Sequence, residues 1–288
     1  MASNHDPQRL APPWIPPATG RANRSRRVIT VDRRRVLWTP AATTTALWLD
    51  AADASTVTTV NGNVSQWNDK SGNGRHVVQG TAGSRPAYTS AGLNGLNVIT
   101  FDGIADQLFN TSAALQRNVN ATTIWAVARP GSNTATLKII LQTLTPTPST
   151  RSYLAYDASN GFAAGGRRLT ADTFQATTAT AYSSSAKILC AQFDYINATL
   201  TVFENGTQVA TRSFQTAGNT PNDGGGLYIG SSNTPAAYWN GMIGEIIIGH
   251  FIPSQSLREQ FEGYLAHEWG LAGGLHGGHP FLTFPPYL

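Results

Sequence analysis

Cysteine, lysine and long apolar runs are what this chain has least of. Its one cysteine, Cys190, excludes an intramolecular disulfide and any zinc site made of cysteines. No apolar run reaches the length of a membrane-spanning helix, so we expect no insertion into a membrane. The N-terminus lacks the apolar segment and cleavage site of a signal peptide, and we therefore expect no classical secretion.

Charge is scarce and unevenly distributed. Only 12% of the 288 residues are charged, and only three residues are lysines. Residues 1–38 hold eight arginines against two aspartates, a net charge of +6, whereas the rest of the chain sums to −2. The basic character therefore belongs to an N-terminal arm. Because the remaining surface is slightly acidic, we do not expect nucleic acid as the partner.

Turn-forming residues and short apolar stretches dominate the rest of the chain. Hydrophobic residues make up 41% of the sequence, which is enough for a core. The 28 glycines, with many Ser, Thr and Asn, favour short strands joined by tight turns. The clearest element is a hairpin over residues 199–210, whose Asn205-Gly206 pair suits a type I′ turn. We predict an all-β fold.

One helix interrupts this pattern, over about residues 254–268. Apolar residues recur within it at helical spacing. Ser254 and Ser256 are alternative N-caps, and Gly270 suits the end of the helix.

The first 40 residues form a separate, extended arm. Prolines flank Trp14, and they exclude a helix interior or an inner strand because they fix φ and remove backbone donors. An arginine-rich run follows. Arginine is enriched at protein interfaces, so we expect the arm to anchor the chain to a partner protein. The anchoring residues that we expect are Trp14, Arg21, Arg24, Arg26, Arg27, Arg33, Arg34 and Arg35.

A series of short motifs follows the arm in a characteristic order. In chain order the motifs are LWLD at Leu47–Asp50, the Trp67–Gly74 loop, FDG at Phe101–Gly103, the Asn205-Gly206 hairpin, YIG at Tyr228–Gly230, GMIGEI at Gly241–Ile246 and the helix end at Gly263–Gly270. This series resembles the laminin-G-like, concanavalin A-like jelly roll. The resemblance implies a β-sandwich of two antiparallel sheets over residues 41–272, closed by the C-terminal helix and followed by a Gly/Pro-rich tail at 273–288.

An arm followed by one such domain is similar to the architecture of bacteriophage minor tail proteins. That resemblance implies a virion protein, made in the host cytoplasm and present in several copies through the symmetry of the particle. Its arm would bind other virion proteins, and its lectin-like sandwich would face outward to contact glycans on the host surface. The alternative is a purely structural capsid or tail decoration protein. Exposed aromatic residues around a groove would favour recognition.

A polysaccharide-degrading glycoside hydrolase is the second alternative. It would need two carboxylates about 5–9 Å apart across a cleft. Catalytic relatives of this fold carry them on one strand in a Glu-x-Asp-x-x-Glu pattern, which this chain lacks. Glu245 stands alone in an apolar strand. We therefore expect no enzymatic activity.

Aromatic residues are the candidate ligand contacts, because sugar rings pack on aromatic faces. We select Tyr238, Trp239 and Trp125, with Tyr153 as a further candidate, although most tryptophans of a sandwich belong to its core.

Three loop aspartates, Asp69, Asp102 and Asp106, are candidate ligands of Ca²⁺, the one cofactor that the resemblance leaves open. The commoner role of such residues is to stabilise turns through backbone hydrogen bonds.

Overall fold

Seventeen strands, one α-helix and four short 3-10 helices make up the described part of this computed structural model. The structure describes residues 36–131, 136–145, 150–157, 161–170, 172, 174–177, 183–214 and 216–288. No helix among these residues is long and apolar enough to cross a membrane. Two of the 3-10 helices lie in connections between strands, at Ala54–Thr56 and Ala82–Ser84. The others precede the first strand, at Pro40–Ala42, and follow the α-helix, at Ala272–Gly274.

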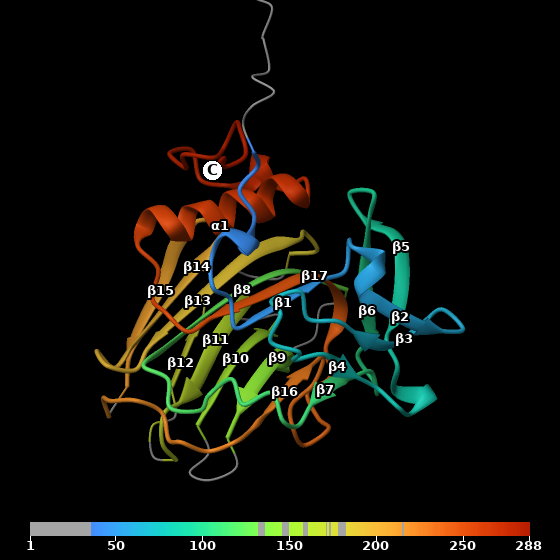
Figure 1. Cartoon of the computed structure of the whole chain (residues 1–288), viewed down its shortest axis with the longest axis horizontal. Coiled ribbons are helices and arrows are strands. Elements are labelled where there is room, and N and C mark those ends of the chain that lie inside the picture. The colour runs from blue at the N-terminus through green and yellow to red at the C-terminus, as the bar shows by residue number, and fades with distance from the viewer. Residues whose placement is uncertain are drawn as a thin grey trace, which may run out of the picture. The chain divides into compact units, whose positions relative to one another are not determined.

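The strands pair antiparallel in two layers (Figure 1). We call the first layer the covered sheet, because the helix lies over its outer face. Near one corner β6 (Leu96–Asp102) pairs with both β17 and β5 (Ala87–Leu93). In spatial order the covered sheet contains β15 (Thr207–Ser213), β14 (Thr199–Glu204), β13 (Lys187–Asp194), β8 (Ala121–Pro130), β17 (Asn240–Gly249) and β1 (Leu47–Asp50).

We call the second layer the open sheet, because α1 lies on the other layer. Its strand β3 also pairs with β5, which joins the two layers at one side. In spatial order the open sheet contains β12 (Phe174–Thr177), β11 (Gly161–Arg167), β10 (Arg151–Asp157), β9 (Lys138–Leu144), β16 (Gly226–Ile229), β7 (Leu108–Asn110), β4 (Val77–Val78), β3 (Asn63–Trp67) and β2 (Val57–Val60).

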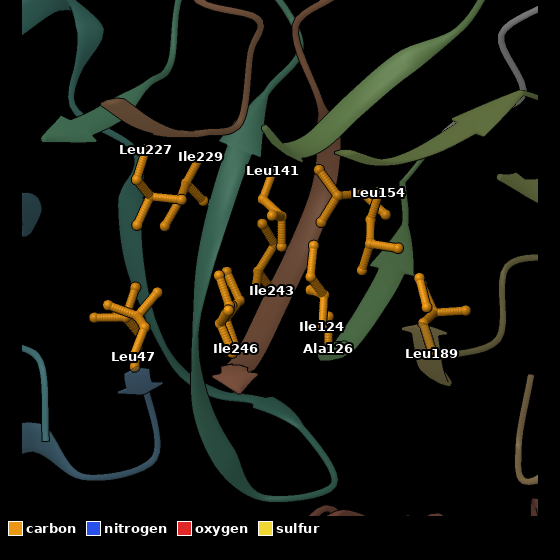
Figure 2. Close-up of a cluster of buried hydrophobic side chains, with 14 of the residues drawn as sticks. Leu47, Ile124, Ala126, Leu141, Leu154, Leu189, Leu227, Ile229, Ile243 and Ile246 are labelled. Carbon is orange, nitrogen blue, oxygen red and sulfur yellow. The ribbon is translucent and has the colours of Figure 1, made fainter. Parts of the chain in front are cut away.

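The main core fills the space between the two sheets (Figure 2). Successive side chains of a strand point to opposite faces, so every second residue enters this core. On β17, Ile246 and Ile248 belong to it, whereas Ile247 points to the outer face. Leu141 and Leu154 enter the same core from the open sheet.

A second core forms on the outer face of the covered sheet, beneath α1 (Gln255–Glu268). The rings of Phe261 and Trp125 stack there with centroids 4.1 Å apart. Ser254 caps the helix, because its hydroxyl accepts a hydrogen bond from the Leu257 N–H at 3.2 Å. The predicted helix is thus confirmed, with Ser254 rather than Ser256 as its cap.

The predicted all-β sandwich with one C-terminal helix is confirmed as well. Asn205 (φ +50°) and Gly206 (φ +80°) form the two-residue turn between β14 and β15. Both residues have the positive φ that a type I′ turn requires.

The folded unit begins at residue 36, five residues before the predicted boundary. The Trp38 N–H donates to the Pro286 carbonyl at 3.0 Å, and the Trp38 ring is 4% exposed against α1. Burying this large ring draws residues 36–40 into the domain. The C-terminal tail is part of the same unit: His279 is buried, and its Nε2 lies 3.3 Å from Oε2 of Glu262 on α1.

Candidate ligand-binding site

The outer face of the open sheet carries a partly exposed aromatic pair. Tyr228 on β16 lies between Leu227 and Ile229, which are completely buried in the main core, so its side chain points outward. Its partner on β7 is Phe109, which follows the buried Leu108. The two rings stack with centroids 6.4 Å apart and 21° between their planes. Both side chains are half-buried, which leaves part of each ring accessible to a ligand.

Backbone register extends this row across the sheet. Tyr228 lies opposite Gln142 of β9, and Gln142 lies opposite Tyr153 of β10. Gln142 and Tyr153 are only 3% and 7% exposed. The loop before β17 lies over this part of the row: the Asn233 N–H donates to Gln142 Oε1 at 3.0 Å, and Ala237 packs into the same apolar cluster as Tyr153. The accessible part of the row therefore ends at Tyr228.

A cavity of about 510 Å³ opens beside Tyr228, and we call it the arginine cleft. Two of its lining residues are Arg151, the first residue of β10, and Arg167, the last residue of β11, which lie directly opposite each other. Its volume lies within the range of about 300–1,000 Å³ that is typical of small-molecule sites. The other lining residues are Thr111, Leu144, Gly224, Gly225, Gly226, Tyr228 and Asn233.

Three consecutive glycines line this cleft. A Cβ atom at Gly225 would lie 1.8 Å from the carbonyl oxygen of Leu144, and one at Gly226 would lie 2.7 Å from the Tyr228 ring. Both distances are shorter than any normal contact, so side chains at these positions would displace the neighbouring strand or ring. The glycine segment therefore approaches β9 closely and leaves the cleft unfilled.

The electrostatic character of the cleft is positive. Arg151 makes no ion pair with any of the described residues, and its Nε–H is buried without a hydrogen-bond partner. Burial, together with the positive charge of Arg151, lowers the pKa of Arg167. Arginine nevertheless stays charged in proteins. Two cationic side chains therefore line the cleft.

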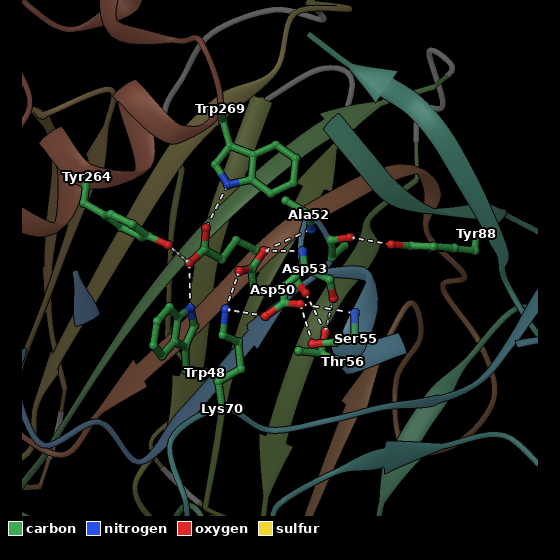
Figure 3. Close-up of polar contacts among 12 residues, drawn as sticks. Trp48, Asp50, Ala52, Asp53, Ser55, Thr56, Lys70, Tyr88, Tyr264 and Trp269 are labelled. Atoms are coloured by element: carbon green, nitrogen blue, oxygen red, sulfur yellow. Dashed lines mark hydrogen bonds and ion pairs between the residues drawn. The ribbon is translucent and has the colours of Figure 1, made fainter. Parts of the chain in front are cut away.

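A second polar cluster lies on the opposite side of the sandwich, under α1 (Figure 3). Glu245 on β17 is completely buried, and burial together with the nearby Asp50 raises its pKa to about 8. Its Oε1 accepts hydrogen bonds from Trp48 Nε1 at 2.7 Å and from the Tyr264 hydroxyl at 3.0 Å. Its Oε2 accepts one from Trp269 Nε1 at 2.8 Å.

Asp50 lies directly opposite Glu245 in the β1–β17 pair, so the chain does contain two neighbouring carboxylates. Lys70 Nζ lies 2.8 Å from Asp50 Oδ2 and 4.5 Å from the centroid of the Trp48 ring. The Glu245 carboxyl group is fully shielded from solvent, and it accepts hydrogen bonds from the side chains of Trp48, Tyr264 and Trp269. A substrate does not reach this pair in the folded conformation. The cluster instead ties α1 to the covered sheet.

The predicted ligand contacts divide between core and surface. Trp125 is fully buried against Phe261, and Trp239 is 1% exposed in the main core, with its ring centroid 6.2 Å from that of Tyr156. The prediction that these two tryptophans contact a ligand is wrong, because both rings are buried by core packing and do not reach the surface. Tyr238 is half-buried and does not line the arginine cleft.

The three candidate calcium ligands do not come together. Asp69 accepts hydrogen bonds from the backbone N–H groups of Trp48 and Arg75, each at 3.0 Å. Asp106 Oδ2 accepts one from the Asp102 N–H at 2.8 Å, and Asp102 in turn accepts from backbone groups of the same turn. Within the described ranges, no three His, Cys, Asp or Glu side chains are grouped to hold a metal ion. These aspartates stabilise turns.

The predicted anchoring residues of the arm all fall outside the described residues. They are Trp14, Arg21, Arg24, Arg26, Arg27, Arg33, Arg34 and Arg35.

Sequence reasoning missed Arg151, Arg167 and Phe109 as site residues, and it used Tyr228 only as a mark of the fold. Two signals were available in the sequence. Tyr228 separates two aliphatic residues in a short strand, which predicts an outward ring. A run of three glycines immediately precedes Leu227. The register that brings the two arginines together is set by pairing between separate strands, and the sequence alone does not show it.

The fold is that of an antiparallel jelly-roll sandwich in which one sheet is covered by a helix and the other carries a cleft. Residues 102–249 match the family model described as the concanavalin A-like lectin/glucanases superfamily, over just more than half of the chain. The chain therefore belongs to the concanavalin A-like lectin/glucanase superfamily. The comparison with curated protein sequences finds no significant match.

Several solved structures share this fold. Domain 4 of AbnA, a GH43 extracellular arabinanase from Geobacillus stearothermophilus solved in complex with arabinotriose, is 12% identical, with a TM-score of 0.53 over 74% of this chain and 95% of that one. The binding domain of botulinum neurotoxin serotype D is 10% identical, with a TM-score of 0.55 over 78% of this chain and 53% of that one. Identities this low show a shared fold only.

Proposed function

We propose that this chain is a non-catalytic glycan-binding protein whose ligand lies on the open sheet. The observation that carries the proposal is the stacked Phe109–Tyr228 pair beside the arginine cleft. Pyranose rings pack on aromatic faces, and a concave site with a few polar groups orients a small ligand. A sandwich of the same fold, domain 4 of the arabinanase, is known in complex with arabinotriose, which is consistent with this use of the architecture.

The proposal includes a place in a bacteriophage particle, with residues 1–35 as the anchor and the sandwich facing outward. The arm holds eight arginines against two aspartates, which suits an acidic surface on another virion protein. The cleft lies on the open sheet, so this sheet is the one that would face the host surface.

A glycan array with the full chain tests recognition, followed by affinity measurements on any sugar that binds. We expect Tyr228→Ala and Phe109→Ala to weaken binding about tenfold, because each removes a ring face that contacts the sugar. Phe284→Ala is the matched control, since Phe284 is 67% exposed in the C-terminal tail and lies outside the cleft. It should leave the affinity unchanged.

Three outcomes would contradict parts of this proposal. Absence of binding to any glycan would favour a purely structural decoration protein. Release of shorter sugars from a bound oligosaccharide would contradict the non-catalytic assignment. Full retention on purified phage particles after replacing Arg33, Arg34 and Arg35 together with glutamine would contradict anchoring through the arm.

A further inference from the structure

We propose that the arginine cleft binds an anionic group of the glycan, so that the ligand is an acidic oligosaccharide. This inference rests on the proposed function, because it assigns the class of sugar that the open sheet would hold. The shared chemistry is an oxyanion on a sugar ring: the carboxylate of a uronic or other sugar acid, a sulfate or a phosphate.

The two arginines are placed to act on one group. Arg151 and Arg167 are direct partners on adjacent antiparallel strands, and both line the same cleft. Side chains at directly opposite positions start about 4.5–5.5 Å apart at Cβ, and like charges there destabilise a sheet. An anion between the two guanidinium groups would turn this repulsion into two attractions. The arrangement therefore favours an anionic ligand over a neutral one.

Arg151 has unused hydrogen-bonding capacity. Its Nε–H is buried with no acceptor, and the guanidinium has no carboxylate partner among the described residues. A buried donor without an acceptor costs free energy, and a ligand oxygen would remove that cost. Guanidinium groups bind carboxylates and phosphates through two parallel hydrogen bonds, which fixes the orientation of the group as well as its charge.

The remaining walls suit a sugar ring next to that anion. Tyr228 offers a ring face at the edge of the cleft, and Asn233 lies on the same lining. The close approach of Gly225 to Leu144 leaves the space in front of the arginines without a side chain. Among the described residues that line the cleft none is acidic, and the adjacent Asp223 is not part of the lining. The described lining therefore carries two positive side chains and no negative one.

The test uses the full chain and a panel of uronic-acid, sulfated and phosphorylated oligosaccharides, each paired with a neutral sugar of the same backbone. Titration calorimetry should show that at least one acidic sugar binds about tenfold or more tightly than its neutral partner, and that added salt weakens only the acidic one. Arg151→Gln and Arg167→Gln should each weaken binding of the acidic sugar about 10- to 100-fold, so that its advantage over the neutral partner is lost.

Two further variants separate site from fold. Arg212→Gln removes the same charge from an exposed position on β15 of the covered sheet, and it should leave binding unchanged. Arg151→Lys keeps the charge but loses the paired donors, so we expect it to restore part of the affinity that Arg151→Gln loses. Thermal unfolding of each variant checks that the domain still folds.

The possible results are distinguishable. Equal binding of acidic and neutral sugars, lost with Tyr228→Ala, would overturn the anion site and leave the proposed function intact. Acidic binding that survives both arginine-to-glutamine changes would overturn the location of the site. Binding of no sugar at all would overturn the proposed function and this inference together. A preference for sulfate or phosphate over carboxylate would support the site and name the source of its anion.

Discussion

The two outer faces of the sandwich make the most instructive comparison in this molecule. Both sheets send every second side chain outward, and both outer faces carry aromatic rings. On the covered sheet α1 buries those rings, and Trp125 stacks with Phe261 in a second core. On the open sheet Phe109 and Tyr228, among the residues that the structure describes, stack only with each other and stay half-buried. The outer face of the covered sheet is thus buried under α1, which stabilises the fold. The outer face of the open sheet remains accessible to a ligand.

The treatment of charge differs in the same way. The buried Glu245 carboxylate on the covered side receives three hydrogen bonds from ring groups, from Trp48, Tyr264 and Trp269. Arg151 on the open side lacks an ion pair within the described part of the chain and keeps an unsatisfied N–H. A polar group that is fully satisfied within the protein, as Glu245 is, helps to hold the fold together. Our proposal assigns the unsatisfied donor of Arg151 to a ligand.

The largest expected effect is on the covered side. Glu245→Ala would leave three buried donors without an acceptor and open a cavity under α1. We expect a loss of about 3–5 kcal/mol in the free energy of unfolding. Urea unfolding measures it, with Gln255→Ala at an exposed position of α1 as the control, which should cost less than about 1 kcal/mol. A similar loss in both variants would show that the Glu245 cluster does not hold the helix.

The protonation of Glu245 gives the next effect, and its sign follows from the direction of the pKa shift. The pKa rises from 4.5 to about 8 on folding, so the folded state holds the proton more tightly. The stability that this group contributes is complete below about pH 4.5 and is lost as the pH rises through about 8. The slope reaches at most about 1.4 kcal/mol per pH unit.

Comparison with Glu245→Gln isolates the contribution of Glu245 to the pH dependence of stability, because the glutamine amide does not titrate. Urea unfolding of both proteins at a series of pH values between 5 and about 8 gives the difference curve. The wild-type protein should lose stability with rising pH relative to the variant. Parallel curves would mean that Glu245 is ionised in the folded protein throughout this range.

The difference between the two faces also marks how far the sequence could predict this molecule. Local patterns predicted individual elements, whereas the sandwich architecture was predicted from the resemblance that the ordered series of motifs carries. The Asn205-Gly206 turn and the capped helix depend on neighbouring residues, and both were predicted correctly. Aromatic residues were harder to place. Whether the Trp125 ring is buried or exposed depends on whether a helix distant in the sequence covers its strand, and no local pattern encodes that.

The site depends on contacts between distant segments, so it was largely hidden. Arg151 and Arg167 meet through the register of β10 with β11. Asp50 and Glu245 also become neighbours through strand pairing, although they are almost two hundred residues apart in the sequence. The apolar sequence around Glu245 gives no sign of this pairing. Strand alternation predicts which way a side chain points, but pairing decides what it meets.

The smallest expected effect concerns Tyr238, the one predicted ligand contact that is not in a core. Tyr238 forms an isolated parallel β-bridge with Ile139 of β9, and it does not line the arginine cleft. We expect Tyr238→Ala to change glycan affinity by less than about twofold, compared with about tenfold for Tyr228→Ala, because only the second ring borders the cleft. Titration of the same sugar into both variants measures the difference. Equal losses would show that the ligand extends across β9, so that the open face binds along its width rather than at one cleft.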